Sequence, residues 1–258
     1  MKVLITGARG TIGSKLVPAL ENDCDLRLLS RTHIPGDPRW LQVDLSDFRQ
    51  IREALEDIEM VIHLAIASGR QGDYEGEEFN SERFDTNVKG TYHLFQAARQ
   101  AGVRRVIYTS SLTVVWGYPY PEKVAGDAPA RPVGTYALTK QLGEQIAAYF
   151  AEVSRLPSLT MRIPAPIDID DPQSRERPIL PQWIAFPDLI QAYQLALKAP
   201  DIDRQIITIV GESSKRRWDL SLAESLLGYQ PQYRLEEMGY TLRQEPDSYE
   251  GQGVVWGP

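Results

Sequence analysis

The 258-residue chain alternates between apolar runs of strand length and segments of helical periodicity from its first residues to residue 163. The apolar runs occupy residues 2–6, 25–30, 40–43, 60–65, 105–110 and 159–163. The helical segments between them span residues 11–21, 47–56, 83–101 and 135–153. The runs are nearly continuous in apolar residues, which is typical of strands that are covered on both faces. The alternation therefore predicts an α/β fold with a doubly wound parallel sheet.

The character of the chain changes after residue 163. Residues 164–187 are rich in proline and charge, which predicts an irregular segment. A helix at 188–198, a strand at 205–210, a short helix at 219–227 and a tail of about twenty residues follow. We expect one integrated domain, with a core over residues 1–163 and a small C-terminal substrate-binding lobe and tail over residues 164–258.

Composition excludes several classes of partner. The net charge of −7 argues against nucleic acid, because phosphate binding needs clustered Lys and Arg. No apolar run approaches the roughly 18–20 residues that span a bilayer, and the strand-like opening MKVLITG leaves no room for a leader. The single Cys24 excludes an intramolecular disulfide and suits a reducing compartment. We expect a cytoplasmic protein without a nucleic-acid or membrane partner, and no residue spacing is typical of a metal site.

A glycine-rich turn directly follows the first apolar run. The stretch TGARGTIG places Gly7, Gly10 and Gly13 three residues apart, between a predicted strand and a predicted helix. Glycine puts no Cβ atom in the way, so amides at a helix N-terminus can approach a pyrophosphate closely. The start of a series of βαβ units is the context that a dinucleotide-binding motif requires. The turn therefore predicts a Rossmann-type core that binds a dinucleotide.

The glycine spacing resembles that of the short-chain dehydrogenase/reductase superfamily, and TGxxGxxG resembles its extended branch, the NAD-dependent epimerase/dehydratase family. Other family-like stretches are VDLSD (43–47), HLAI (63–66), TNVKGTYHLFQAA (86–98), YTSS (108–111) and LLGYQP (226–231). The resemblance covers residues 1–230 and implies an NAD(P)-dependent oxidoreductase, in which Asp44 binds the adenine amino group. The residues that it assigns to the cofactor are Gly7, Arg9, Gly10, Thr11, Ile12, Gly13, Arg31, Asp44, Leu45, Leu64, Ala65, Asn87, Lys140 and Ile163.

The choice between NAD and NADP depends on the charge at the end of the second apolar run. A carboxylate there accepts from the ribose hydroxyls of NAD, whereas an arginine suits the 2′-phosphate of NADP. The run ends in Ser30 and Arg31 with no acidic residue before Asp37, and Arg9 in the glycine turn is a second candidate for the phosphate. We expect NADP, while NAD stays open if both arginines are solvated surface residues.

Tyr136 and Lys140 stand four residues apart in GTYALTKQLGEQIAAYF (134–150), so they share one face of the predicted helix. A free phenol titrates near pH ~10, and a nearby ammonium group and a nicotinamide cation favour its phenolate. The resemblance implies that Tyr136 is the general acid/base and that Lys140 holds the nicotinamide ribose. It implies that Ser111, rather than Ser110, hydrogen-bonds the reacting oxygen, since the second serine of the pair has this role in the family.

Fewer than a hundred residues follow the last strand of the core, which favours a substrate smaller than a sugar nucleotide. DAPARPVGTYALTKQLGE (127–144) resembles the corresponding stretch of uronate dehydrogenases, which oxidise hexuronic acids at the anomeric carbon. The chain departs from them at the pocket, where Leu112 and Thr113 replace an Asn-His pair and Ala165 replaces a serine. Arg175 or Arg177 is a candidate to bind a carboxylate, unless both are solvated loop charges. The residues that we expect to face the substrate are Ser68, Ser110, Leu112, Thr113, Ala165, Arg175 and Arg177.

Three functions stay open on the sequence alone. The first is an NAD(P)-dependent dehydrogenase or reductase of a small hydroxy or carbonyl compound, including a sugar or uronic acid. The second is an epimerase or dehydratase that retains its cofactor, and the third is a cofactor sensor, against which the Ser111, Tyr136 and Lys140 set argues. The helices at 83–101 and 135–153 carry apolar residues on more than one face. The resemblance implies that this pair packs against its copy, so we expect a homodimer.

Overall fold

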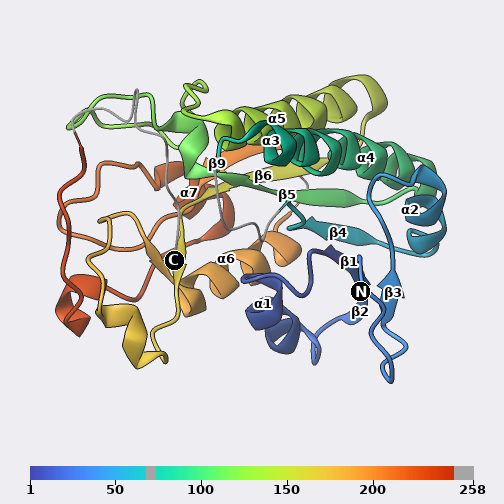
Figure 1. Ribbon diagram of the computed structural model, residues 1–258, viewed down its shortest axis with the longest axis horizontal. Coiled ribbons are helices and arrows are strands. Elements are labelled where there is room, and N and C mark those ends of the chain that lie inside the picture. The colour runs from blue at the N-terminus through green and yellow to red at the C-terminus, as the bar shows by residue number, and fades with distance from the viewer. Residues whose placement is uncertain (68–73, 201, 247–258) are drawn as a thin grey trace.

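The structure is a computed structural model that describes residues 1–67, 74–200 and 202–246. Its centre is a seven-stranded parallel sheet in the order β3-β2-β1-β4-β5-β6-β9 (Figure 1). The strands are β1 (Lys2–Thr6), β2 (Asp25–Ser30), β3 (Trp40–Gln42), β4 (Met60–His63), β5 (Arg105–Ser111), β6 (Ser158–Ile163) and β9 (Arg204–Thr208). The chain moves outward from β1 in both directions, so the predicted doubly wound Rossmann-type sheet is confirmed.

Helices cover both faces of this sheet. The helices are α1 (Gly13–Leu20), α2 (Phe48–Ala54), α3 (Glu77–Arg83), α4 (Gly90–Ala101), α5 (Thr135–Ser154), α6 (Phe186–Lys198) and α7 (Ser221–Leu227). Figure 1 shows α3, α4 and α5 on one face, and α1 and α6 on the other. The central strand β1 contributes to both cores, because Val3 and Ile5 pack on the α1 and α6 side while Leu4 packs on the α4 and α5 side. Burial on both faces explains why the strand sequences are continuous in apolar residues.

The helix that the sequence predicts at 83–101 begins earlier in the structure. It starts as α3 at Glu77, continues as a π-helix over Phe84–Lys89 and then becomes α4. The buried side chains of α3 are Phe79 and the charged Arg83. The first turns therefore lack an apolar period, and the sequence pattern could not reveal them.

The segment that the sequence predicts to be irregular contains a second, two-stranded parallel sheet. Its strands are β7 (Pro166–Ile167) and β8 (Ile184–Ala185), and a 3₁₀ helix (Pro172–Arg175) lies between them. Strands of two residues are too short for an alternating pattern to appear in a sequence.

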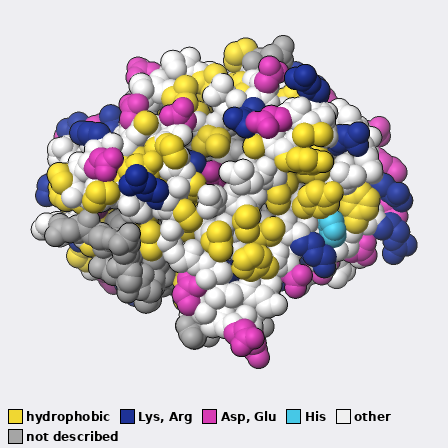
Figure 2. All heavy atoms as spheres, turned by 90° about the horizontal axis from the view of Figure 1, so that it is seen from above, with side chains coloured by type: hydrophobic (Ala, Val, Ile, Leu, Met, Phe, Trp, Pro, Cys, Tyr) yellow, Lys and Arg dark blue, Asp and Glu magenta, His cyan; other side chains and the backbone are white. Residues whose placement is uncertain are grey.

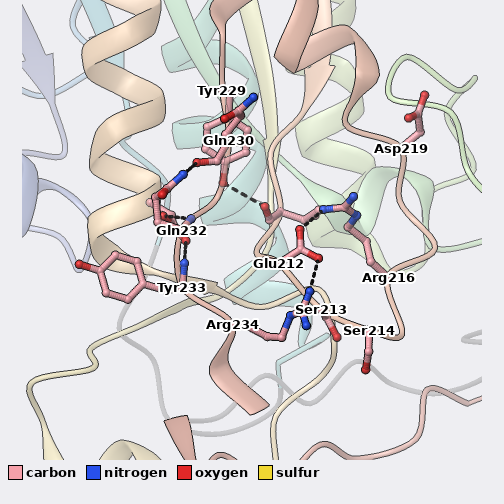
Figure 3. Close-up of polar contacts among 12 residues, drawn as sticks. Glu212, Ser213, Ser214, Arg216, Asp219, Tyr229, Gln230, Gln232, Tyr233 and Arg234 are labelled. Carbon is pink, nitrogen blue, oxygen red and sulfur yellow. Dashed lines mark hydrogen bonds and ion pairs between the residues drawn. The ribbon is translucent and has the colours of Figure 1, made fainter. Parts of the chain in front are cut away.

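The C-terminal segment is tied to the rest of the molecule by polar contacts. Figure 3 shows Gln232 and Tyr233, whose backbone N–H groups donate to the carboxylate of Asp188 at 2.8 and 3.1 Å. Farther along, where the sequence predicts a tail, the buried Glu245 pairs with the buried Arg217 at 2.9 Å. Part of the predicted tail is therefore packed, because it carries the counter-charge of a buried arginine.

In the described residues, no helix is long and apolar enough to cross a membrane. The same residues contain no group of three or more His, Cys, Asp or Glu side chains that could hold a metal ion.

Candidate active site

The glycine turn connects the carboxyl end of β1 to α1. Gly7 has φ +66°, and a Cβ atom on it would lie 2.8 Å from the backbone nitrogen of Ala65. A Cβ atom on Gly13 would lie 2.5 Å from the carbonyl oxygen of Gly7. No side chain caps α1, whereas the backbone nitrogens of Ser14 and Lys15 donate to the carbonyl oxygens of Gly10 at 2.9 Å and Ile12 at 3.1 Å. Both positions require glycine, and the turn fits the pyrophosphate of a dinucleotide.

The two arginines that the sequence analysis selected lie together beyond the carboxyl end of β2. Nη1 of Arg9 donates to Oγ1 of Thr32 at 3.1 Å, and Nη1 of Arg31 lies 3.3 Å from a carboxylate oxygen of Glu82. Both arginines are exposed, and Ser30 rather than an acidic residue ends the strand. This is the place where a Rossmann-bound dinucleotide puts its adenosine ribose.

The other predicted cofactor residues follow the same edge of the sheet. Asp44 is exposed and accepts from the backbone nitrogen of Ser46 at 2.8 Å. Asn87 is buried, and its Oδ1 accepts from the backbone nitrogen of Ala67 at 2.8 Å. Leu45, Leu64 and Ile163 are buried, Ile12 and Ala65 are half-buried, and Gly10 and Thr11 are exposed.

The three predicted catalytic residues come together where β5 meets α5. Ser111 ends β5, while Tyr136 and Lys140 occupy the first two turns of α5. The Ser111 side chain lies close enough to Tyr136 to favour its phenolate. The Ser111 hydroxyl also accepts from the backbone nitrogen of Thr113 at 3.2 Å and from its Oγ1 at 2.9 Å. Nζ of Lys140 lies 4.6 Å from the centre of the Tyr108 ring.

The environment of Tyr136 keeps its hydroxyl protonated. Burial raises the pKa of Tyr136 well above its ordinary value, and the neighbouring Tyr74 raises it further. The nearby Ser111 side chain and the guanidinium charge of Arg83 oppose this shift by stabilising the phenolate. Arg83 is a charged residue of a helix, which the sequence pattern does not single out.

Lys140 lies in a different electrostatic setting. Burial lowers the pKa of its ammonium group from 10.5 to about 7, while the Glu144 carboxylate one turn along α5 opposes this shift. At neutral pH the lysine is therefore poised between its charged and neutral forms.

A buried ion pair between Arg162 of β6 and Glu144 of α5 lies next to this site. Nε and Nη2 of Arg162 donate to the two carboxylate oxygens of Glu144 at 2.9 and 2.7 Å, and the Ser110 hydroxyl donates to the same carboxylate at 2.6 Å. The predicted substrate residue Ser110 is thus engaged inside the protein, one position before Ser111. The sequence offered no signal for the pair, since charged residues in a helix and a strand are usually solvated.

The structure places the other predicted substrate residues in different surroundings. Leu112 is buried and Ala165 is half-buried. Arg175 and Arg177 are exposed, and the guanidinium of Arg175 lies over the ring of Tyr240. Thr113 is buried against Ser111, whereas Ser68 lies outside the described residues. The structure shows no contact between either of these arginines and the three predicted catalytic residues.

The parallel sheet, the glycine turn and the grouping of Ser111, Tyr136 and Lys140 agree with the arrangement expected of an extended short-chain dehydrogenase. Residues 3–186 match the sequence profile of the "NAD dependent epimerase/dehydratase family". The chain belongs to this family.

Named relatives span almost the whole chain. A uronate dehydrogenase of Pseudomonas syringae pv. tomato is 28% identical over 235 residues, which cover 89% of this chain and 81% of the relative. An NAD-dependent glucose-6-phosphate dehydrogenase of Haloferax volcanii is 26% identical over 264 residues, with 95% and 97% covered. The crystal structure of a glucuronic acid dehydrogenase from Chromohalobacter salexigens superposes with a TM-score of 0.81 at 23% identity, covering 96% of this chain and 92% of that one.

Proposed function

We propose that the protein oxidises a hydroxyl group of a small sugar-derived substrate to a carbonyl group, or catalyses the reverse reaction. The observation that carries this proposal is that Ser111 at the end of β5 lies with Tyr136 and Lys140 of α5, at the edge of the sheet that also holds the glycine turn. The names of the relatives, which include a uronate dehydrogenase and a sugar-phosphate dehydrogenase, support a carbohydrate substrate. Residues 164–258, which follow the catalytic residues, supply the substrate-binding lobe in this proposal.

The assigned residues divide the work of proton transfer. In oxidation, the phenolate of Tyr136 takes the proton of the substrate hydroxyl, while Ser111 donates a hydrogen bond that steadies the reacting oxygen. When bound, the nicotinamide ring accepts or returns the hydride. In reduction, Tyr136 donates its proton to the forming alkoxide, and its raised pKa keeps it protonated at neutral pH. Oxidation should therefore accelerate as the pH rises, because a larger fraction of Tyr136 is ionised.

The experiment that tests this proposal follows nicotinamide absorbance after the protein is mixed with NADP or NAD and a panel of hexuronic acids, neutral aldoses and simple alcohols. Reduction of the cofactor with a sugar or sugar acid supports the dehydrogenase. Conversion of a sugar or sugar nucleotide at constant absorbance supports the alternative, an epimerase or dehydratase that retains its cofactor. Binding of cofactor without conversion of any compound would support the sensor and contradict both enzymatic proposals.

NADP is the cofactor that the charges at the end of β2 favour. Arg9 and Arg31 lie there with Thr32, and no acidic residue ends the strand. The names of the family and of one relative give NAD, which supports the competing choice. We expect Arg31→Ala to raise the KM for NADP roughly 10- to 100-fold, as for loss of a charge-assisted contact, and to leave the KM for NAD nearly unchanged. Arg99→Ala, which replaces an exposed arginine of α4, is the control. If Arg31→Ala raised the KM values for NADP and NAD equally, NADP specificity would be contradicted.

A homodimer through α4 and α5 is the assembly that the surface supports. Figure 2, which views the molecule from the side of these helices, shows hydrophobic side chains gathered over this face. Its large exposed members are Phe84, Tyr92, Leu138, Tyr149 and Val153, which are 40–64% exposed. Light scattering should give twice the chain mass, and Tyr149→Glu combined with Val153→Glu should give a monomer. A monomeric parent protein would refute the dimer.

The cytoplasmic location stays a prediction.

A further inference from the structure

Arg83 is a buried cation at the C-terminal end of α3 to which the proposed chemistry gives no role. Its side chain is 1% exposed, and its guanidinium lies 3.9 Å from the ring centre of Tyr74 and 4.2 Å from that of Phe79. Nη1 donates to Oδ1 of Asn80 at 2.7 Å and lies 3.8 Å from a carboxylate oxygen of Glu75. The Arg83 guanidinium also lies close enough to the Tyr74 hydroxyl to oppose the rise in the pKa of Tyr74 that burial causes, but within the described part of the chain Nε and Nη2 have no hydrogen-bond partner. A guanidinium does not deprotonate in proteins, so two unpaired buried nitrogens, which together carry three N–H groups, have a substantial free-energy cost.

The two unpaired nitrogens form one edge of the guanidinium plane. Arg162 uses the same edge to hold the carboxylate of Glu144 through Nε and Nη2. Arg83 thus presents, without a partner, the edge that fits a carboxylate with two parallel hydrogen bonds. Glu75 does not occupy this edge, because it approaches Nη1, and its carboxylate accepts from the backbone nitrogen of Thr135 at 3.3 Å.

Arg83 lies next to the first turn of the catalytic helix. Asn87, four residues farther along the same helical segment, donates through Nδ2 to Oγ1 of Thr139 at 3.0 Å, and that hydroxyl donates to the carbonyl oxygen of Tyr136 at 2.8 Å. Residues four apart share a helix face, so Arg83 faces the beginning of α5, where Tyr136 lies. The lowering effect of the Arg83 charge on the pKa of Tyr136 agrees with this placement.

We propose that Arg83 is a specificity-determining residue that binds the carboxylate of a sugar-acid substrate through Nε and Nη2, beside the hydroxyl of Tyr136. The inference rests on the proposed dehydrogenase function and narrows its substrate to an acid. It gives the carboxylate-binding role to a buried arginine rather than to the exposed Arg175 or Arg177. A buried fork that lacks its partner penalises a neutral sugar, so selectivity for the acid follows from the same unpaired groups.

The test compares glucuronate with glucose as substrates of the parent protein and of Arg83→Met. Methionine keeps the apolar contact with the two rings, and replacing a buried charge by an apolar side chain is often tolerated. The expected result is a rise in KM for glucuronate of roughly 10- to 100-fold, with the KM for glucose unchanged within about twofold. Arg83→Lys keeps the charge without the fork and should lose most of the same preference. Arg104→Met, which replaces an arginine directly before the amino end of β5, is the control.

A second measurement keeps the inference separable from the proposed function. Calorimetric titration of glucuronate into the cofactor-loaded protein reports binding whether or not turnover occurs. If the parent protein binds glucuronate and Arg83→Met does not, the inference stands even where no turnover is detected and the dehydrogenase proposal falls. Turnover of neutral aldoses alone would support the dehydrogenase and overturn the role of Arg83. Equal losses for glucuronate and glucose, or a loss with Arg175→Met instead, would also overturn it.

Discussion

Burial of Lys140 makes the stability of the cofactor-free protein depend on pH in a predictable direction. The ammonium group has a pKa of about 7 in the folded protein, against 10.5 for an ordinary lysine, because burial outweighs the opposing Glu144 carboxylate. Between these two values the unfolded chain holds this proton and the folded protein has released it. The free energy of unfolding therefore rises with pH in this window, by up to about 1.4 kcal/mol per pH unit.

The magnitude follows from the two pKa values. At pH 7 the folded lysine is half protonated, so the rise begins at half its full slope, and from pH 7 to pH 9 it amounts to about 2 kcal/mol. For a chain of 258 residues this corresponds to roughly 4–8 °C in the melting temperature. Urea unfolding at both pH values measures the same difference directly.

Lys140→Met removes this titrating group and keeps most of its volume. In this variant the free energy of unfolding should no longer rise by about 2 kcal/mol between pH 7 and pH 9. At pH 7 the variant should be more stable than the parent, because the buried charge of Lys140 destabilises the parent there. Lys89→Met is the control, since Lys89 is 52% exposed and pairs with the exposed Asp85. Groups that do not interact with Lys140 or Lys89 titrate equally in all three proteins and cancel in the comparison. Identical pH dependence in the parent and in Lys140→Met would refute the argument.

Three further predictions concern single side chains. Tyr136→Phe should fold and bind cofactor but lose turnover by at least ~100-fold, as steady-state rates and a fluorescence titration would show, and retention of most activity would refute its acid/base role. Gly13→Ala should weaken cofactor binding and lower the melting temperature, because the new Cβ atom would lie 2.5 Å from the Gly7 carbonyl oxygen, and unchanged binding by titration would contradict this. Glu144→Gln leaves Arg162 buried without its counter-charge and should cost about 3–5 kcal/mol in urea unfolding, whereas a change below ~1 kcal/mol would mean that the pair is replaceable.

The sheet could be predicted from the sequence because every central strand is buried on both faces. Val3, Leu4 and Ile5 alternate between the two cores, so each position must be apolar, and the run is visible without knowledge of its neighbours. The short strands β7 and β8 and the helix α3 were not predictable in this way. The buried positions of α3 are an aromatic residue and an arginine, and a periodicity analysis does not score arginine as a core residue.

The candidate site divides along a similar line. The glycine turn and the Tyr136–Lys140 pair are defined by local spacing, so the sequence indicated them and the structure brings them to one edge of the sheet. Arg83 and Glu144 could not be selected, since a charged residue in a sequence is usually solvated. Their importance comes from burial by segments distant in the chain, such as β6 with Arg162, and no local pattern records that burial.

One face of α5 carries both the predicted catalytic residues and a buried carboxylate. Tyr136, Lys140 and Glu144 follow one another at intervals of four, so a helical repeat places all three on the same face. Tyr136 is half-buried and reaches the open edge of the sheet, whereas Lys140 and Glu144 are buried beneath it. Glu144 is held in place by its ion pair with Arg162. The negative charge of the Glu144 carboxylate opposes the loss of the Lys140 proton. A substitution of Glu144 should therefore affect Lys140 and Tyr136 through the change in charge as well as through the change in packing. For this reason the pH dependence of activity in Glu144→Gln, and not its stability alone, will show how far the chemistry of Tyr136 depends on the buried pair.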